Sequence, residues 1–145
     1  MVNRDLLALK LAELHDRVER VRVNAPSALE ELRSDRDALD LVAFNLMLAV
    51  QTCSDVASHI IADEGWPVAK TLGDGFARLA EFGVIQLETA RALQRAVGLR
   101  NVVAHGYAAL DVARCFEAAH TGLTELSDFA QQVSRWATHS TIPGS

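Results

Sequence analysis

The residues between Leu99 and Tyr107 bring together side chains that could do chemistry. Arg100, His105 and Tyr107, which is the chain's only tyrosine, lie within eight positions, beside Gly106. A guanidinium offers a planar fork of donors that suits a phosphate group, and an imidazole titrates close enough to neutral pH to move protons in a cell. These side chains therefore supply what cleavage of a phosphodiester requires: an acid or base, and a cation that stabilises the developing negative charge.

Their spacing restricts how Arg100 and His105 can share one site. Five residues turn a straight helix by about 500°, so the two side chains would point roughly 140° apart. Either the helix ends inside the motif, which Gly106 permits, or two copies of the chain complete the site. A purely structural interpretation is also open, in which the arginine caps a helix C-terminus, the histidine satisfies a carbonyl and the tyrosine packs in the core with its hydroxyl at the rim.

Helices must position these side chains, because apolar residues recur every three or four positions along the chain. The three clearest stripes run over residues 7–21, 39–60 and 112–137, and such a stripe is typical of a helix packed against other helices. No segment alternates apolar and polar residues with period two. The predicted class is therefore all-α, an antiparallel bundle of four or five helices.

Local chemistry sets the expected helix boundaries in the first half of the chain. Pro26 should end the first helix, since proline disfavours helix in the residue before it. Ser34 or Asp35 can cap the second helix, which should run to about Glu64 and stop at Gly-Trp-Pro over residues 65–67.

The second half is divided by glycines and a capping aspartate. A turn over residues 71–75 should precede a short helix over 76–81, and the next helix should cover 86–97 and end near Gly98. Asp111 is the expected cap of the last helix, which should reach about Ala137.

Length and composition fit one globular domain. The chain has 145 residues, of which 50% are hydrophobic and 23% charged; we expect the domain over residues 1–137 and a small, polar, frayed tail over 138–145. Charge interrupts the N-terminus, and no apolar run is long enough for a membrane span, so neither a secretory signal nor a membrane location is predicted. Two cysteines do not make a disulfide framework, and a reducing cytoplasm is the expected compartment. The net charge of −5 disfavours binding to long duplexes but leaves room for chemistry on RNA at a small basic cluster.

Other candidate sites are weaker. Asp55 and His59, four residues apart on the second helix, could form half a metal site, but no third ligand is evident and a hydrogen bond between them is the simpler interpretation. We predict no metal, since no third ligand is evident, and no cofactor. The chain also has no phosphate-cradling glycine loop and no nucleophile elbow. Arg91 and Arg95 could add positive charge around Arg100, although their spacing is also normal for a solvated helix face.

The pattern Arg-x-x-x-x-His-x-Tyr over residues 100–107, with the polar Asn101 after the arginine, resembles the signature of HEPN domains. More specifically, it is similar to the HepT toxin family, the helical partners of minimal nucleotidyltransferase antitoxins of the MntA type. Residues 45–61 resemble that family's long central helix, and residues 76–85 resemble its short helix before the motif. One departure is Val-Val-Ala over 102–104, where a bulkier apolar residue is expected before the histidine, and it affects only local packing.

The resemblance implies the toxin of a type VII-like toxin–antitoxin pair: a metal-independent endoribonuclease that acts as a homodimer with the motif at the interface. By this resemblance, Arg100 would stabilise the phosphate transition state with Asn101 in support. His105 would transfer protons during attack by the ribose 2′-hydroxyl, which restricts the substrate to RNA. Tyr107 would accept AMP from the partner nucleotidyltransferase, and the added bulk and negative charge beside the arginine would block the substrate.

Two other functions stay open on the sequence. The chain could be a non-catalytic helical binding module that docks a nucleotidyltransferase or a nucleotide, and the acidic net charge slightly favours this alternative. It could also be a purely structural dimer, in which case substitutions in the motif would act only through stability.

Overall fold

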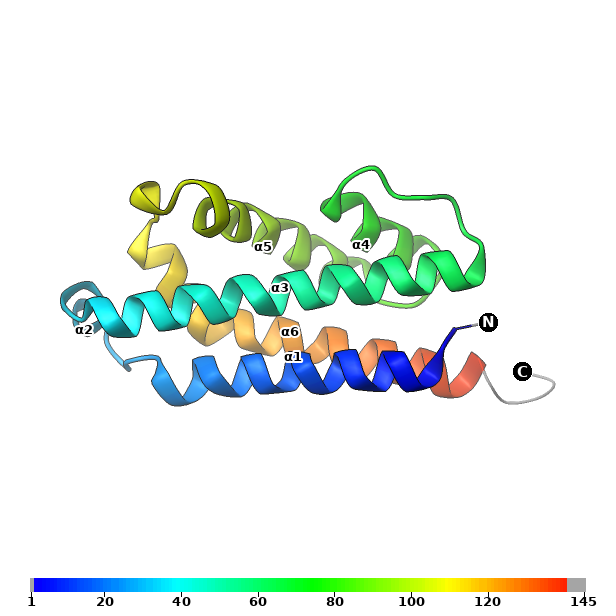
Figure 1. Ribbon diagram of the computed structural model, residues 1–145, viewed down its shortest axis with the longest axis horizontal. Helices are drawn as coiled ribbons and strands as arrows, with labels where there is room; N and C mark the ends of the chain where they lie inside the picture. The colour runs from blue at the N-terminus through cyan, green and yellow to red at the C-terminus, as the bar shows by residue number, and fades with distance from the viewer. Residues whose placement is uncertain (1, 141–145) are drawn as a thin grey trace.

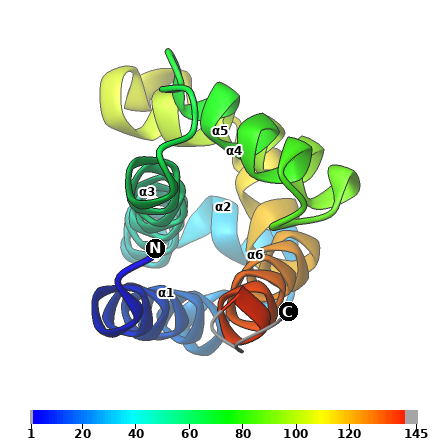
Figure 2. The same ribbon diagram turned by 90° about the vertical axis from the view of Figure 1, so that its right-hand side faces the viewer.

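The computed structural model describes residues 2–140, and within them it contains helices and no strand. Figure 1 shows a long α3 through the middle of an elongated bundle, and Figure 2, which looks along the bundle, shows α1, α3, α5 and α6 around a common centre with α4 beside α5. This confirms the predicted all-α antiparallel bundle. The described elements are α1 (Arg4–Asn24), α2 (Leu29–Ser34), α3 (Arg36–Glu64), α4 (Leu72–Glu81), α5 (Leu87–His105), a 3₁₀ turn η1 (Tyr107–Ala109) and α6 (Val112–Ser140).

The central position of α3 explains its composition. It contacts α1, α4, α5 and α6, and Val42, Cys53 and Ile60 on it are fully buried. Among the described residues, α3 is the one helix long and apolar enough to span a membrane by length and composition, with a mean hydropathy of 1.3. Because 61% of that apolar window is buried inside the bundle, its hydropathy is accounted for by the core that it fills.

The boundaries of the first half follow the capping chemistry. α1 ends at Asn24, two residues before Pro26, as predicted. Of the two candidate caps for α3, Asp35 is the one used, because its carboxylate accepts a hydrogen bond from the Ala38 N–H at 3.1 Å. The short α2 was not predicted: it has six residues and a single buried one, Leu32, too few to show a helical period.

Two helix boundaries differ from the predictions over residues 71–105. α4 begins at Leu72 instead of residue 76, because the Thr71 hydroxyl accepts from the Asp74 N–H at 3.1 Å and starts the helix one turn earlier. The predicted end of α5 near Gly98 is wrong, since the helix continues to His105. A glycine inside a helix costs only about 1 kcal/mol, and burial of Leu99 against the core offsets it.

α6 begins where the sequence indicates and continues further than expected. The Asp111 carboxylate accepts hydrogen bonds from the N–H groups of Ala113 and Arg114, at 3.0 and 3.4 Å. The helix runs to Ser140, three residues past the expected end at Ala137. Residues 141–145 of the expected tail lie outside the described residues.

An aromatic cluster closes the end of the bundle at which α3, α4 and α6 terminate. Trp66 stacks on Phe82, with ring centroids 4.2 Å apart and planes 7° from parallel. Trp136 meets Trp66 edge-on at 6.0 Å. Both tryptophans of the chain therefore lie at the end of α3 far from its first turn.

Candidate functional site

The predicted motif lies on the last turns of α5 and on η1. Arg100 and His105 belong to one uninterrupted helix, so their side chains project about 140° apart. Arg100 is half-buried and turned toward α3, whereas His105 is exposed. The helix does end inside the motif, at His105 with Gly106 as its C-cap, but it ends after both residues and so does not bring Arg100 and His105 to one side. Completion of the site by a second copy stays a prediction.

The guanidinium of Arg100 is fixed by two hydrogen bonds. Its Nη2 donates to Gln51 Oε1 at 2.7 Å, and its Nη1 donates to Asn101 Oδ1 at 2.9 Å. Gln51 is held in turn, because its Nε2 donates to Asp55 at 3.4 Å. The buried Nε of Arg100 has no hydrogen-bond partner among residues 2–140. A charge-assisted bond of 2.7 Å from a neighbouring helix orients the cation before any ligand binds.

Tyr107 is tied to α3 in the same way. Its hydroxyl donates a short hydrogen bond to the Asp40 carboxylate, which joins η1 to the first turns of α3. Burial raises the pKa of Tyr107 above its ordinary value, and the hydrogen bond to Asp40 and the negative charge of Asp40 raise it further, against a smaller lowering by Arg36. The phenol is therefore a neutral donor at cellular pH.

An open groove of about 820 Å³ lies beside this tyrosine, bounded by α1, the first half of α3 and the corner between α5 and η1. We call it the tyrosine groove. Its volume is within the range of small-molecule sites. The polar and aromatic side chains that line it include Arg17, Arg20, Arg36, Asp40, Phe44 and Tyr107.

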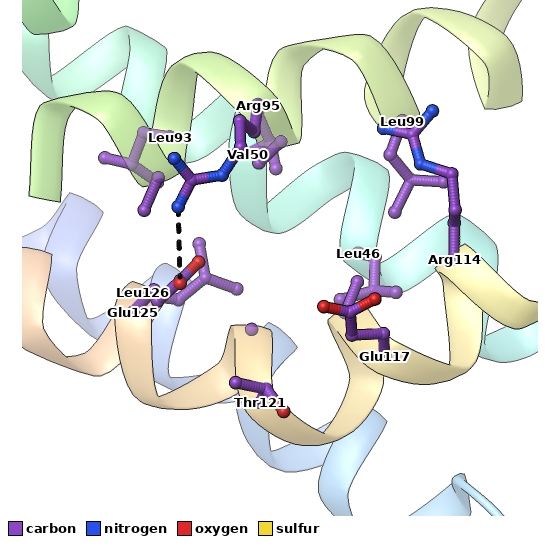
Figure 3. A pocket seen from close by; sticks show the side chains of 14 residues that line it. Leu46, Val50, Leu93, Arg95, Leu99, Arg114, Glu117, Thr121, Glu125 and Leu126 are labelled. Atoms are coloured by element: carbon purple, nitrogen blue, oxygen red, sulfur yellow. Dashed lines mark ion pairs between the residues drawn. The ribbon is translucent and has the colours of Figure 1, made fainter. Parts of the chain in front are cut away.

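A second cavity lies between α5 and α6 above α3, and it contains none of the motif residues (Figure 3). Its volume is about 290 Å³. Arg95 lies in its lining and pairs with Glu125 on α6, at 3.8 Å. Arg91 lies nine residues before Arg100 on the same helix, about 13 Å along the axis. Basic support for Arg100 from these two arginines stays a prediction.

The weaker candidates resolve as structural residues. Asp55 contacts Gln51 and, at 3.8 Å, Lys10, so the expected hydrogen bond with His59 is wrong. Among the described residues no three histidine, cysteine or acidic side chains gather in a group that could hold a metal ion. Both cysteines are core residues, because each thiol is free and buried. Burial raises the pKa of Cys53, and it raises the pKa of Cys115 to about 11.

Gln51 and Asp40 are the site residues that the sequence did not reveal. They lie 49 and 67 positions from the residues that they bind, so no local spacing connects them to the motif. One signal was present for Gln51: it is a polar residue inside the most apolar helix of the chain.

Two known proteins are similar to this chain over most of its length. A relative from Archaeoglobus fulgidus, named a candidate RNase, is 31% identical over 122 residues, which cover 84% of this chain and 91% of the relative. The mRNA nuclease HepT of Shewanella oneidensis is 26% identical over 108 residues, covering 74% of this chain and 80% of that protein.

The fold is also that of a solved toxin. The structure of the tri-AMPylated Shewanella oneidensis HEPN toxin, in complex with its MNT antitoxin, superposes with a TM-score of 0.85 at 22% identity and covers 92% of this chain and 99% of that one. A family model described as Ribonuclease HepT-like matches residues 13–133. The match covers most of the chain, and the arginine, histidine and tyrosine of the motif lie at the end of α5 and on η1 of an all-helical bundle. The chain therefore belongs to the HepT-like family.

Proposed function

We propose that this protein is the toxin of a type VII-like toxin–antitoxin pair, a cytoplasmic, metal-independent endoribonuclease that works as a homodimer. The observation that carries the proposal is the fixed guanidinium of Arg100, held by Gln51 and Asn101 on the helix that also presents an exposed His105. Membership of the family and the nuclease name of the Shewanella relative support it.

The chemistry follows from the two side chains. The imidazole of His105 takes part in proton transfer as the ribose 2′-oxygen attacks the adjacent phosphorus. The bond between phosphorus and the 5′-oxygen then breaks, and the 5′-oxygen takes up a proton as it leaves. Arg100, oriented in advance, stabilises the negative charge that builds on the phosphate oxygens. DNA lacks the attacking hydroxyl and is not a substrate.

The dimer is proposed because one helix cannot aim both side chains at one phosphate. A second copy, related by a twofold axis, can place its His105 opposite the Arg100 of the first, which gives two composite sites per dimer. Mixing two inactive variants tests this arrangement. In an equimolar, refolded mixture of Arg100→Ala and His105→Ala, half of the dimers are mixed and each has one intact site, so about a quarter of wild-type RNA cleavage should return. No recovery in dimers shown to be mixed would place both residues of each site on one chain.

Regulation is proposed to act through Tyr107 and a minimal nucleotidyltransferase antitoxin. The tyrosine oxygen attacks the α-phosphorus of ATP, a new oxygen–phosphorus bond forms, and pyrophosphate leaves as the bond to the bridging oxygen breaks. The phenolic proton passes to Asp40, whose carboxylate already accepts it in a hydrogen bond. The AMPylated state of the Shewanella toxin supports such a step in this family.

One experiment tests the function and its regulation together. The chain is purified after expression alone and after expression with its neighbouring nucleotidyltransferase, and intact mass and RNA cleavage are measured on both samples. We expect cleavage by the chain alone, loss of cleavage with AMP-sized mass increments after co-expression, and neither increment nor loss for Tyr107→Phe. His105→Ala should be folded, inactive and harmless to growth. Cleavage by folded His105→Ala at the wild-type rate would refute the catalytic assignment, and no cleavage by the wild-type chain alone would favour the non-catalytic binding module.

A further inference from the structure

The tyrosine groove carries a local charge opposite to that of the whole chain. Its lining includes Arg17, Arg20 and Arg36 but only one carboxylate, Asp40, a local excess of two positive charges in a chain of net charge −5. Arg17 is also oriented, because its Nη1 donates at 3.1 Å to Oδ1 of Asn45, a buried amide. A concave surface lined by guanidinium groups is suited to a phosphate.

One face of α3 adds an aromatic ring to this charge. Arg36, Asp40 and Phe44 recur every four residues and therefore lie in a row on the helix, about 12 Å from end to end. Phe44 is 51% exposed, although it is a large apolar residue beside a buried core. An accessible ring next to guanidinium groups offers a base-stacking surface close to phosphate donors.

Attachment of AMP to Tyr107 would break the hydrogen bond between the tyrosine oxygen and the Asp40 carboxylate. In the unmodified chain the hydroxyl donates to Asp40; after esterification it has no proton to donate, and an anionic phosphodiester stands beside an anionic carboxylate. Like charges at this distance repel. Positive charge lies in the same groove, and Arg36 already acts electrostatically on the Tyr107 oxygen.

We propose that the tyrosine groove is a nucleotide-binding site, and that the AMP carried by Tyr107 folds into it. The phosphate lies against Arg36 and Arg17, and the adenine stacks on Phe44. The attached nucleotide then acts as a tethered occupant that holds the modified state in one conformation. The identity of the tethered occupant rests on the proposed adenylylation of Tyr107, whereas the groove's affinity for a nucleoside monophosphate does not.

Free AMP is the probe that tests the groove by itself. Calorimetric titration of the unmodified full-length chain with AMP should show saturable binding at millimolar concentrations, and adenosine, which lacks the phosphate, should bind more weakly. Arg36→Gln should weaken AMP binding at least tenfold, as expected for the loss of one charge-assisted hydrogen bond to phosphate. Phe44→Ala should weaken AMP and adenosine alike. Arg33→Gln is the matched control, because this arginine is exposed on α2 and pairs with Glu30 outside the groove.

Adenylylated protein separates this proposal from the regulation on which it rests. Once mass spectrometry confirms AMP on Tyr107, the modified chain should no longer bind free AMP. Wild-type protein co-expressed with an inactivated nucleotidyltransferase, which carries no AMP, should bind it like the protein expressed alone. Absence of the mass increment would refute the regulatory step and leave the free-AMP result standing. The groove proposal is overturned if unmodified protein binds no AMP, if Arg36→Gln and Phe44→Ala bind it as well as Arg33→Gln does, or if adenylylated protein binds free AMP unchanged.

Discussion

Gln51→Leu tests whether α3 holds the guanidinium of Arg100, the proposed catalytic cation, in place. Gln51 Oε1 accepts the 2.7 Å hydrogen bond from Arg100 Nη2, and leucine is close to glutamine in size but accepts no hydrogen bond. The substitution leaves Arg100 with Asn101 as its one hydrogen-bond partner among the described side chains. We expect the guanidinium to leave the position that Gln51 and Asn101 hold it in, without any change in the fold.

The size of the effect follows from the kind of bond that is lost. A hydrogen bond to a charged group contributes about 1.5–3 kcal/mol. If that energy is used fully in the transition state, kcat/KM for RNA cleavage falls by about 10- to 150-fold. Stability should change by less than about 1 kcal/mol, because Gln51 and Arg100 are only half-buried and water can replace the lost partner.

Three matched measurements separate positioning from a general structural effect. Single-turnover cleavage of an RNA oligonucleotide gives the rate, and urea denaturation gives the free energy of unfolding. Gln51→Glu, which keeps an acceptor oxygen at the same place, should retain most of the activity that Gln51→Leu loses. Gln131→Leu, an exposed glutamine on α6, should be neutral in both assays. The reasoning is refuted if folded Gln51→Leu cleaves RNA within threefold of wild type, or if the glutamate variant is as impaired as the leucine variant.

Three further predictions concern the rest of the fold. Because its pKa is raised, Tyr107 stays protonated in the folded state at pH values above the ordinary tyrosine pKa of 10.0. The free energy of unfolding should therefore be unaffected by this group below pH 10 and should fall as the pH rises further. Tyr107 is the only tyrosine, so absorbance titration of the native protein reports it alone, and Asp40→Asn should lower its pKa. The thiol of Cys115, whose pKa burial raises to about 11, should resist thiol reagents near neutral pH and react on unfolding, so rapid labelling of native protein would contradict its burial. Gly65→Ala should destabilise the protein by about 1 kcal/mol in urea denaturation, because Gly65 has φ 70°. Gly98→Ala should stabilise it by about as much, because Gly98 lies inside α5 and the nearest neighbour atom is 3.9 Å from the added Cβ. Equal effects of one sign would refute this account of the two glycines.

Most of the fold could be predicted because its determinants are local. The apolar stripes predicted the long helices, and the side chains of Asp35 and Asp111 marked helix starts that the structure confirms. The errors came where packing overrides a local signal. Gly98 suggests a helix end, but the burial of its neighbour Leu99 carries the helix through it.

The site could be predicted only in part, for the opposite reason. Arg100, His105 and Tyr107 are close in sequence, so their spacing could be recognised as a pattern. Gln51 and Asp40, which bind Arg100 and Tyr107, come from α3, and the register of α3 against α5 depends on the packing of the whole bundle. No rule of spacing connects Gln51 to an arginine 49 positions later.

The aromatic cluster at the far end of the bundle determines what the intrinsic fluorescence of this protein reports. Trp66 and Trp136 are its only tryptophans, and they lie together beyond the end of α3 at Glu64, about 36 Å along the helix axis from Asp40. Their emission follows the docking of α4 and α6 on the end of α3, and a nucleotide bound at the tyrosine groove is too far away to quench them by contact. Unfolding curves from fluorescence therefore measure the same end of the molecule in every variant of the motif. The two tryptophans are thus an internal stability reference for the motif at the other end.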